Sequence, residues 1–361
     1  MKRKRKCKSF FVRFQKNRAK KIERNLRKKR KLSKGKSRKN SWHYSLSQIR
    51  KDFPDYQHVW APPYFSLVEN ETQALDFLTR LKQCLDKKRK VLVHLERVTR
   101  MTTDAIVVLL SNMVRFKSMH VDFNGTHPMD RCVRGVLIKS GFFKYLFNQY
   151  KDEENYEFNE KNSKIYTHGS KAVASSLADR LIESASKSLW GEPRRCQGAQ
   201  KTLVELMHNT FDHASLQKGE KHWWLSVEHN KKEKCATFSF IDFGMGIYNS
   251  LENKATNDPL RKAWNTLKSL NPFAKSQVEL IKLILKGELH RSQSGDYYRG
   301  KGLAKIYELC KGNKISSLCI ISNMAYINVE KEDYHTIKNE FQGTFISFQI
   351  NENTRSLPWQ I

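Results

Sequence analysis

The chain has 361 residues, of which 39% are hydrophobic and 29% charged, and its formal net charge is +31. This length allows two ordinary domains, each with a core of its own. No apolar run reaches the roughly 18–20 residues of a membrane span, and no signal-peptide segment follows the basic start. We therefore expect a cytoplasmic protein without a membrane span. The seven cysteines form no CxxC pair, which predicts reduced thiols.

Positive charge is concentrated at the N-terminus, where the first forty residues contain 21 Lys or Arg and a single Glu. Because so few apolar residues cannot form a core, residues 1–41 are expected to be a disordered or conditionally helical arm. Such an arm binds polyanions through counterion release, and RNA or DNA is the expected partner. A ribosome or an anionic membrane surface would also fit, and a solubilising tail is the simplest alternative.

Alternating helix and strand patterns follow, and they predict a small α/β domain over residues 42–155. Apolar residues at helical spacing predict helices over 71–85, 102–116 and 129–146. A short apolar run predicts a buried strand over 90–95, and a second strand is expected over 118–125. A polar, acidic link over 148–164 contains the expected domain boundary.

The stretch KVLVHLERVTRMTTDAIVVLLSNM resembles the central strand, loop and helix of STAS domains, the fold of anti-sigma-factor antagonists. In those regulators a partner kinase phosphorylates a serine in the loop, and Thr103 is the nearest match here. The family's Asp-Ser-Ser-Gly sequence is absent. Thr102 and Thr103 also suit the start of a helix, which is the alternative interpretation.

From about residue 165 the pattern predicts an α+β sandwich, a mixed sheet with helices on one face, over 165–353. Helices are expected over 170–189, 197–215 and 299–310, with a long helical insert between the last two. Within the insert, residues 270–290 form an amphipathic pattern that could dock a protein partner. Strands are expected over 222–230, 234–244, 315–323, 325–330 and 344–350.

Four motifs in this second half contain the candidate functional residues. Glu205 and Asn209 are one helical turn apart and share a face of their helix. The strand over 234–244 ends in IDFGMGI, RGKGL opens a later helix, and a GT pair precedes the last strand. In this order and spacing the motifs resemble the ATP-binding fold of the GHKL superfamily, which includes gyrase, MutL, histidine kinases and anti-sigma-factor kinases.

The resemblance implies ATP and Mg²⁺ as cofactors, a lid over about 248–299 and a role for each motif. Asn209 would supply an amide oxygen to Mg²⁺, which prefers oxygen ligands, and Glu205 would act as the catalytic base. Asp242 would accept the exocyclic amine of adenine, with support from Thr344. Glycines allow close backbone approach, and helix N–H groups bind phosphate. The other implied ATP-binding residues are Asp212, Gly244, Gly246, Gly300, Lys301, Gly302 and Leu303.

Three functions fit this pattern. The first is a Mg-dependent ATPase acting as a nucleotide-controlled switch, localised to nucleic acid by its arm. The second is a serine/threonine protein kinase resembling the anti-sigma-factor kinases, joined to its antagonist-like partner in one chain. The third is a nucleic-acid-binding scaffold with an inactive ATP fold. The retained Glu205, Asn209 and Asp242 favour the first. A homodimer would suit the resemblance, since GHKL and STAS domains often work in pairs.

Overall fold

The computed structural model describes residues 53–147, 164–168, 175–213, 223–270, 276–291 and 302–358. The predicted basic arm, residues 1–41, lies outside these ranges. Residues from Asp55 onward belong to one compact unit. Its strands and helices are those of a mixed α/β protein, as the sequence predicts.

The first part of this unit contains two small parallel sheets, one of three strands and one of two, with helical crossovers. β1, β3 and β5 pair in that order, and β2 pairs with β4, all in parallel. Parallel neighbours require a crossover connection, which α3 and α4 provide. The bounds are β1 (Gln57–Trp60), β2 (Tyr64–Phe65), α3 (Glu71–Asp86), β3 (Val91–His94), β4 (Arg100–Met101), α4 (Thr103–Ser118), β5 (Phe123–Gly125), α5 (Arg131–Lys139) and α6 (Phe142–Phe147).

One helix predicted in this part is in fact two. The apolar pattern over 129–146 runs through a break between α5 and α6. Ser140 ends α5, and Gly141 adopts φ +85°, a left-handed conformation that glycine tolerates and that commonly ends helices.

The second part is a five-stranded sheet in the order β10-β11-β9-β8-β6, and every neighbouring pair is antiparallel. The mixed sheet expected from the sequence is thus wrong, because hairpins connect β8 to β9 and β10 to β11. The bounds are β6 (Lys164–His168), α7 (Ser175–Trp190), β7 (Arg194–Arg195), α8 (Gln197–His213), β8 (Trp223–Asn230), β9 (Cys235–Asp242), α9 (Ile247–Glu252), α10 (Pro259–Leu270), α11 (Gln277–Leu285), α12 (Glu288–Arg291), α13 (Gly302–Lys311), β10 (Ser316–Asn328), β11 (Asp333–Asn351) and β12 (Leu357–Pro358).

The hairpin of β10 and β11 is longer than predicted. The runs 315–323 and 325–330 form one strand, whose register with β11 shifts between Ser316 and Cys319 and again around Asn323. β11 starts eleven residues before the predicted strand at residue 344, as its bounds show. Its first half is mostly exposed or half-buried, with only Ile337 and Phe341 buried among residues 333–342, so it lacks the continuous apolar run that marks a buried strand.

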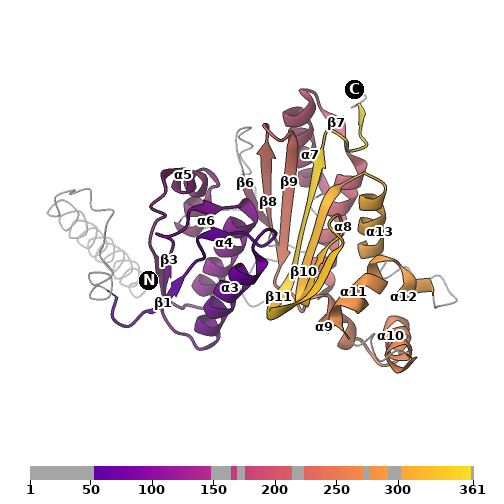
Figure 1. The fold of residues 1–361 in the computed structure, drawn as a ribbon, viewed down its shortest axis with the longest axis horizontal. Helices are drawn as coiled ribbons and strands as arrows, with labels where there is room; N and C mark the ends of the chain where they lie inside the picture. The colour runs from indigo at the N-terminus through magenta and orange to yellow at the C-terminus, as the bar shows by residue number, and fades with distance from the viewer. Residues whose placement is uncertain are drawn as a thin grey trace, which may run out of the picture. The chain divides into compact units, whose positions relative to one another are not determined.

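Helices cover both faces of the large sheet, which corrects the expected one-sided sandwich. Figure 1 shows α7, α8 and α13 along one face, where Trp223 and Phe240 join the core beneath them. Trp224, Ile241 and Phe345 point to the opposite face and belong to the same core as the residues of α3 and α4. Because the strands carry large apolar side chains on both faces, both must be shielded from water.

α4 is the central element of this second core. Every residue from Thr103 to Val114 is buried, so the helix has no solvent-facing side over that length. A helix buried on all sides belongs in the interior of a protein, and the buried polar side chains of Asp104 and Ser111 are hydrogen-bonded there. The predicted α/β part and the predicted ATP-binding part therefore share buried surface through α4.

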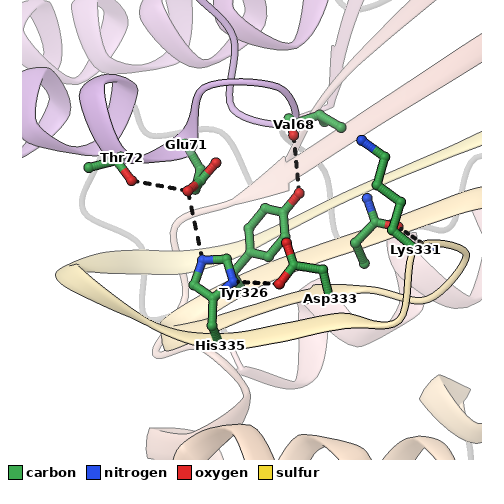
Figure 2. A network of polar contacts seen from close by, with 8 residues as sticks. Val68, Glu71, Thr72, Tyr326, Lys331, Asp333 and His335 are labelled. Carbon is green, nitrogen blue, oxygen red and sulfur yellow. Dashed lines mark hydrogen bonds and ion pairs between the residues drawn. The ribbon is translucent and has the colours of Figure 1, made fainter.

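Polar contacts at the far end of the β10–β11 hairpin reinforce this shared surface, as Figure 2 shows. The Tyr326 hydroxyl donates to the Val68 carbonyl at 3.1 Å, and the Tyr326 ring stacks on His335 with centroids 4.7 Å apart. His335 Nε2 lies 3.7 Å from Glu71 at the start of α3, while Nδ1 lies 2.9 Å from Asp333. Burial raises the pKa of the Tyr326 phenol, which keeps it protonated as the donor.

The insert expected to act as a lid is described over 248–270 and 276–291, and it is largely helical. The apolar side chains of α11 are buried, in two internal cores. Within the segment proposed to dock a protein partner, residues 270–290, the apolar face of α11 is therefore occupied within the chain. These buried residues are Val278, Leu280, Ile281, Ile284 and Leu285.

Within the described ranges, no helix has the length and apolar character needed to cross a membrane. The cysteines described there are free thiols: Cys84, Cys132, Cys196, Cys235, Cys310 and Cys319.

Candidate nucleotide site

Asp242 is the last residue of the central strand β9 and faces the helical layer. Phe240 lies in the core beneath α7 and α8, whereas Ile241 lies in the core shared with α4. Alternation along the strand therefore directs Asp242 to the side of Phe240. Burial raises the pKa of the Asp242 carboxyl to about 6, although hydrogen bonds from Gly244 and Thr344 lower it. At neutral pH most of this carboxyl is ionised and can accept hydrogen bonds.

Thr344 is the partner of Asp242 in the register between β9 and β11. Gly343, just before it, has φ +98°, and a Cβ there would lie 2.0 Å from the Asp242 carbonyl oxygen. Only glycine fits this backbone conformation and this close approach. The structure thus brings together Asp242 and the Gly-Thr pair, as the sequence predicts.

The loop after Asp242 is fixed by side chains of β10. Gly244 N donates to Asp242 Oδ1 at 2.8 Å. Gly246 has φ +78°, and a Cβ there would lie 2.4 Å from Asn323 Oδ1. The Asn323 amide donates to the Met245 carbonyl at 2.9 Å and accepts from the backbone N–H of Tyr248 at 3.0 Å. Both predicted glycines therefore lie in a defined turn.

Ser322 and Asn323 are not among the residues that the sequence predicts for the site. The Ser322 hydroxyl donates to the Gly343 carbonyl at 3.0 Å and accepts from Ile247 N at 2.9 Å, so it joins the two glycine segments. The available signal was a Ser-Asn pair inside an otherwise apolar strand, at the point where the predicted strands break.

The α8 residues Glu205 and Asn209 are both partly buried, and Asp212 belongs to the last turn of the same helix. The helix turns its apolar side to the core, because Leu203, Leu206 and Met207 are buried. Glu205 and Asn209 therefore lie at the margin of the core.

Gly302, the first residue of α13, lies directly against Glu205. A Cβ at Gly302 would be 2.1 Å from Glu205 Oε1, so the start of α13 approaches this carboxyl as only glycine permits. Leu303 contacts two of the internal cores. Gly300 and Lys301 lie outside the described residues.

The two pairs, Asp242 with Thr344 and Glu205 with Gly302, border one core. Leu206 of α8, Phe240 of β9 and Ile306 of α13 are buried members of it, and Ile247 packs against it from the loop after Asp242. Among the described residues, no three His, Cys, Asp or Glu side chains converge on a common point.

Thr103, the predicted phosphoacceptor, lies away from the site around Asp242. It is only 3% exposed, and its hydroxyl donates to Glu228 Oε2 at 2.8 Å. Glu228 shares the α4-facing side of β8 with Trp224, and its partner Thr237 is five residues before Asp242. Five residues of strand span roughly 16 Å. The hydroxyl is therefore buried on the sheet face opposite Asp242, as a packed residue at the start of α4.

No protein-family model matches the chain, and neither a curated protein nor a solved structure matches it.

Proposed function

We propose that this protein binds ATP between α8, the end of β9 and the start of α13, and that it acts as a Mg-dependent ATPase of the GHKL type, a nucleotide-controlled switch. The observation that carries the proposal is the ionisable Asp242 at the end of the central strand, paired with Thr344 and bordered by glycines that no other residue could replace. This arrangement offers a hydrogen-bond acceptor for the amino group of adenine at the end of a strand whose neighbouring backbone is fixed.

The phosphates would lie toward α8 and α13. A helix of ten residues presents unpaired backbone N–H groups at its start, which suit phosphate oxygens. The absence of a Cβ at Gly302 lets the start of α13 approach the Glu205 carboxyl directly. Both features fit a nucleotide whose phosphates extend from the adenine site.

Asn209 would hold Mg²⁺ together with the phosphates, since an amide oxygen is a suitable ligand for this hard cation. When bound, Mg²⁺ neutralises charge that develops on the phosphates. Glu205, one turn earlier on α8, would orient a water molecule and accept its proton. Its position against Gly302, the first residue of α13, supports this role beside the proposed phosphates.

The kinase alternative receives less support. Thr103, the nearest match to a phosphoacceptor, is buried on the far face of the sheet from Asp242. Transfer from a bound nucleotide to Thr103 of the same chain would require the shared core around α4 to open. A switch that reports nucleotide state needs no such step.

The test is ATP binding and turnover by the full chain with Mg²⁺, for the wild type, Glu205→Ala and Asn209→Ala. We expect the wild type to bind and hydrolyse ATP, Asn209→Ala to lose Mg-dependent binding, and Glu205→Ala to bind with turnover reduced about 100-fold or more, the contribution typical of a catalytic base. Glu233→Ala removes an exposed turn carboxylate and should match the wild type. Absence of ATP binding by the folded wild type would refute the proposal.

The basic arm extends the proposal to nucleic acid. Its roughly +20 net charge over forty residues should release many counterions on binding RNA or DNA, so the affinity should fall steeply with salt. Turnover measured with and without RNA and DNA, for the full chain and for a chain lacking residues 1–41, shows whether the arm is coupled to the switch. Stimulation that requires the arm is expected.

A further inference from the structure

One guanidinium, that of Arg115 on α4, contacts both segments that carry the proposed adenine-binding pair. Its Cζ lies 4.5 Å from the centroid of the Phe243 ring, and Nη1 lies 3.4 Å from Gln342 Oε1, a long hydrogen bond. Phe243 directly follows Asp242, and Gln342 is two residues before Thr344. Arg115 therefore contacts the residue next to Asp242 and a residue two positions from Thr344.

The contact comes from the face of the sheet opposite the proposed nucleotide. Phe243 packs against the core shared with α4, in the same alternation that directs Asp242 toward the helical layer. A rigid peptide plane joins the two residues, so the position of the Phe243 ring constrains the direction of the Asp242 carboxyl.

The segment with Asp242 and Phe243 is also in close contact with the segment that contains Gln342, Gly343 and Thr344. A Cβ at Gly343 would lie 2.0 Å from the Asp242 carbonyl oxygen and 2.8 Å from Phe243 Cα. A displacement of either segment must therefore displace the other. On their outer side, Phe243 and Gln342 line a small surface hollow together with Arg115 and residues of α3 such as Lys82.

We infer that Arg115 is a positioning residue for the proposed adenine site, a role that rests on the proposed function. It touches neither the base nor the phosphates. It holds Phe243 and Gln342 from the α4 side, and so keeps Asp242 and Thr344 in the geometry that recognises the amino group of adenine. The α/β part of the chain would then set the nucleotide affinity, and a partner that shifts α4 would change it. By linkage, bound ATP would strengthen the contact in return.

The experiment compares ATP with ITP, whose 6-oxo purine lacks the amino group that Asp242 would accept. Affinities of the full chain for both nucleotides are measured by calorimetry with Mg²⁺. In Arg115→Ala we expect ATP to bind about tenfold more weakly, the loss expected for a partly desolvated cation–π contact, with ITP unchanged. The preference for ATP should fall by the same factor. A merely structural role would weaken both nucleotides alike and would overturn the inference.

Companion variants make the test specific. Phe243→Leu should lose the same preference, Phe243→Tyr should keep it, and Arg115→Ala combined with Phe243→Leu should be no worse than either alone. Lys82→Ala is the matched control, because Lys82 lines the same hollow and pairs with Asp86 of its own helix. It should leave both affinities unchanged.

The outcomes separate this inference from the proposed function. If the wild type prefers ATP and Arg115→Ala has the same preference, the positioning role is wrong and the ATP site stands. If the wild type binds no nucleotide, the proposed function itself fails. If Arg115→Ala does not fold, Phe243→Leu and the exposed-side-chain variant Gln342→Ala decide, and an unchanged preference in both would overturn the inference.

Discussion

The Asp242 carboxyl shows how a candidate functional residue can act against stability. An aspartate at the end of a strand usually gains stability by remaining ionised, but burial here raises its pKa from 3.8 to about 6. The folded state therefore holds the proton more tightly than the unfolded state does. Protonation stabilises the fold, and the wild type loses that stabilisation as the pH rises from about 4 to about 6.

Asp242→Asn tests this directly, because asparagine keeps an oxygen for the Gly244 N–H but never ionises. The free energy of unfolding of the variant should match the wild type near pH 4 and exceed it by about 1–2 kcal/mol above pH 6, a figure reduced from the full shift to allow for partial exposure. Urea unfolding at the two pH values measures the difference. ATP binding should be lost in the same variant, and a variant that is less stable at pH 8 would contradict the pKa shift.

The residues of the site were predictable to different degrees. Glu205, Asn209 and Asp242 could be proposed from the sequence because carboxylates and amides are conspicuous beside apolar helix and strand residues. Ser322 and Asn323 act through backbone contacts across the sheet, and Arg115 acts from another part of the chain. Such contacts depend on register and packing, which no local spacing reveals.

At the scale of elements, the start of α13 makes a sharp prediction. Gly302→Ala would place a methyl group 2.1 Å from Glu205 Oε1, so either the carboxyl or the helix start must move. We expect ATP turnover to fall at least tenfold, since catalytic groups tolerate little displacement, and phosphate binding to weaken. Steady-state turnover and ATP affinity of the variant measure both effects.

Gly135→Ala provides the matched control for this change. Gly135 lies within α5, and a Cβ there would meet nothing within 4 Å. Because alanine favours helix formation, the control should gain about 0.5–1 kcal/mol in stability and leave turnover unchanged. Equal turnover in Gly302→Ala and the wild type would show that the approach of α13 to Glu205 is unimportant for catalysis.

Element types followed from the sequence more readily than their arrangement. Helical spacing located α3, α4, α7 and α8, and apolar runs located β3, β8 and β9 within a few residues. The first half of β11 was missed because only one of its faces is buried. The sequence could not predict that helices cover both faces of the large sheet. An apolar strand face must be buried, but it does not show which element packs against it.

At the scale of the whole molecule, the core around α4 should make the chain from Asp55 onward unfold as one cooperative unit. Ile106 of α4 is fully buried in the core that also contains Trp224, Ile241 and Phe345 of the large sheet. Ile106→Ala should therefore cost about 2–5 kcal/mol, the usual range for such a core truncation. The loss should lower protection from hydrogen exchange equally in β3 of the small sheet and in β9 of the large one, because both open through the same transition.

Leu357→Ala is the control for that measurement, since Leu357 is 58% exposed on β12 and its truncation should leave protection unchanged. Native-state hydrogen exchange at increasing urea concentrations distinguishes the two possible behaviours. If Ile106→Ala lowers protection in β3 while β9 keeps its wild-type value, the two sheets open independently, and α4 could not transmit the position of Arg115 to a nucleotide. Matching losses in both would mean that the α/β part and the proposed ATP-binding part share one folding equilibrium, which is the condition for either to regulate the other.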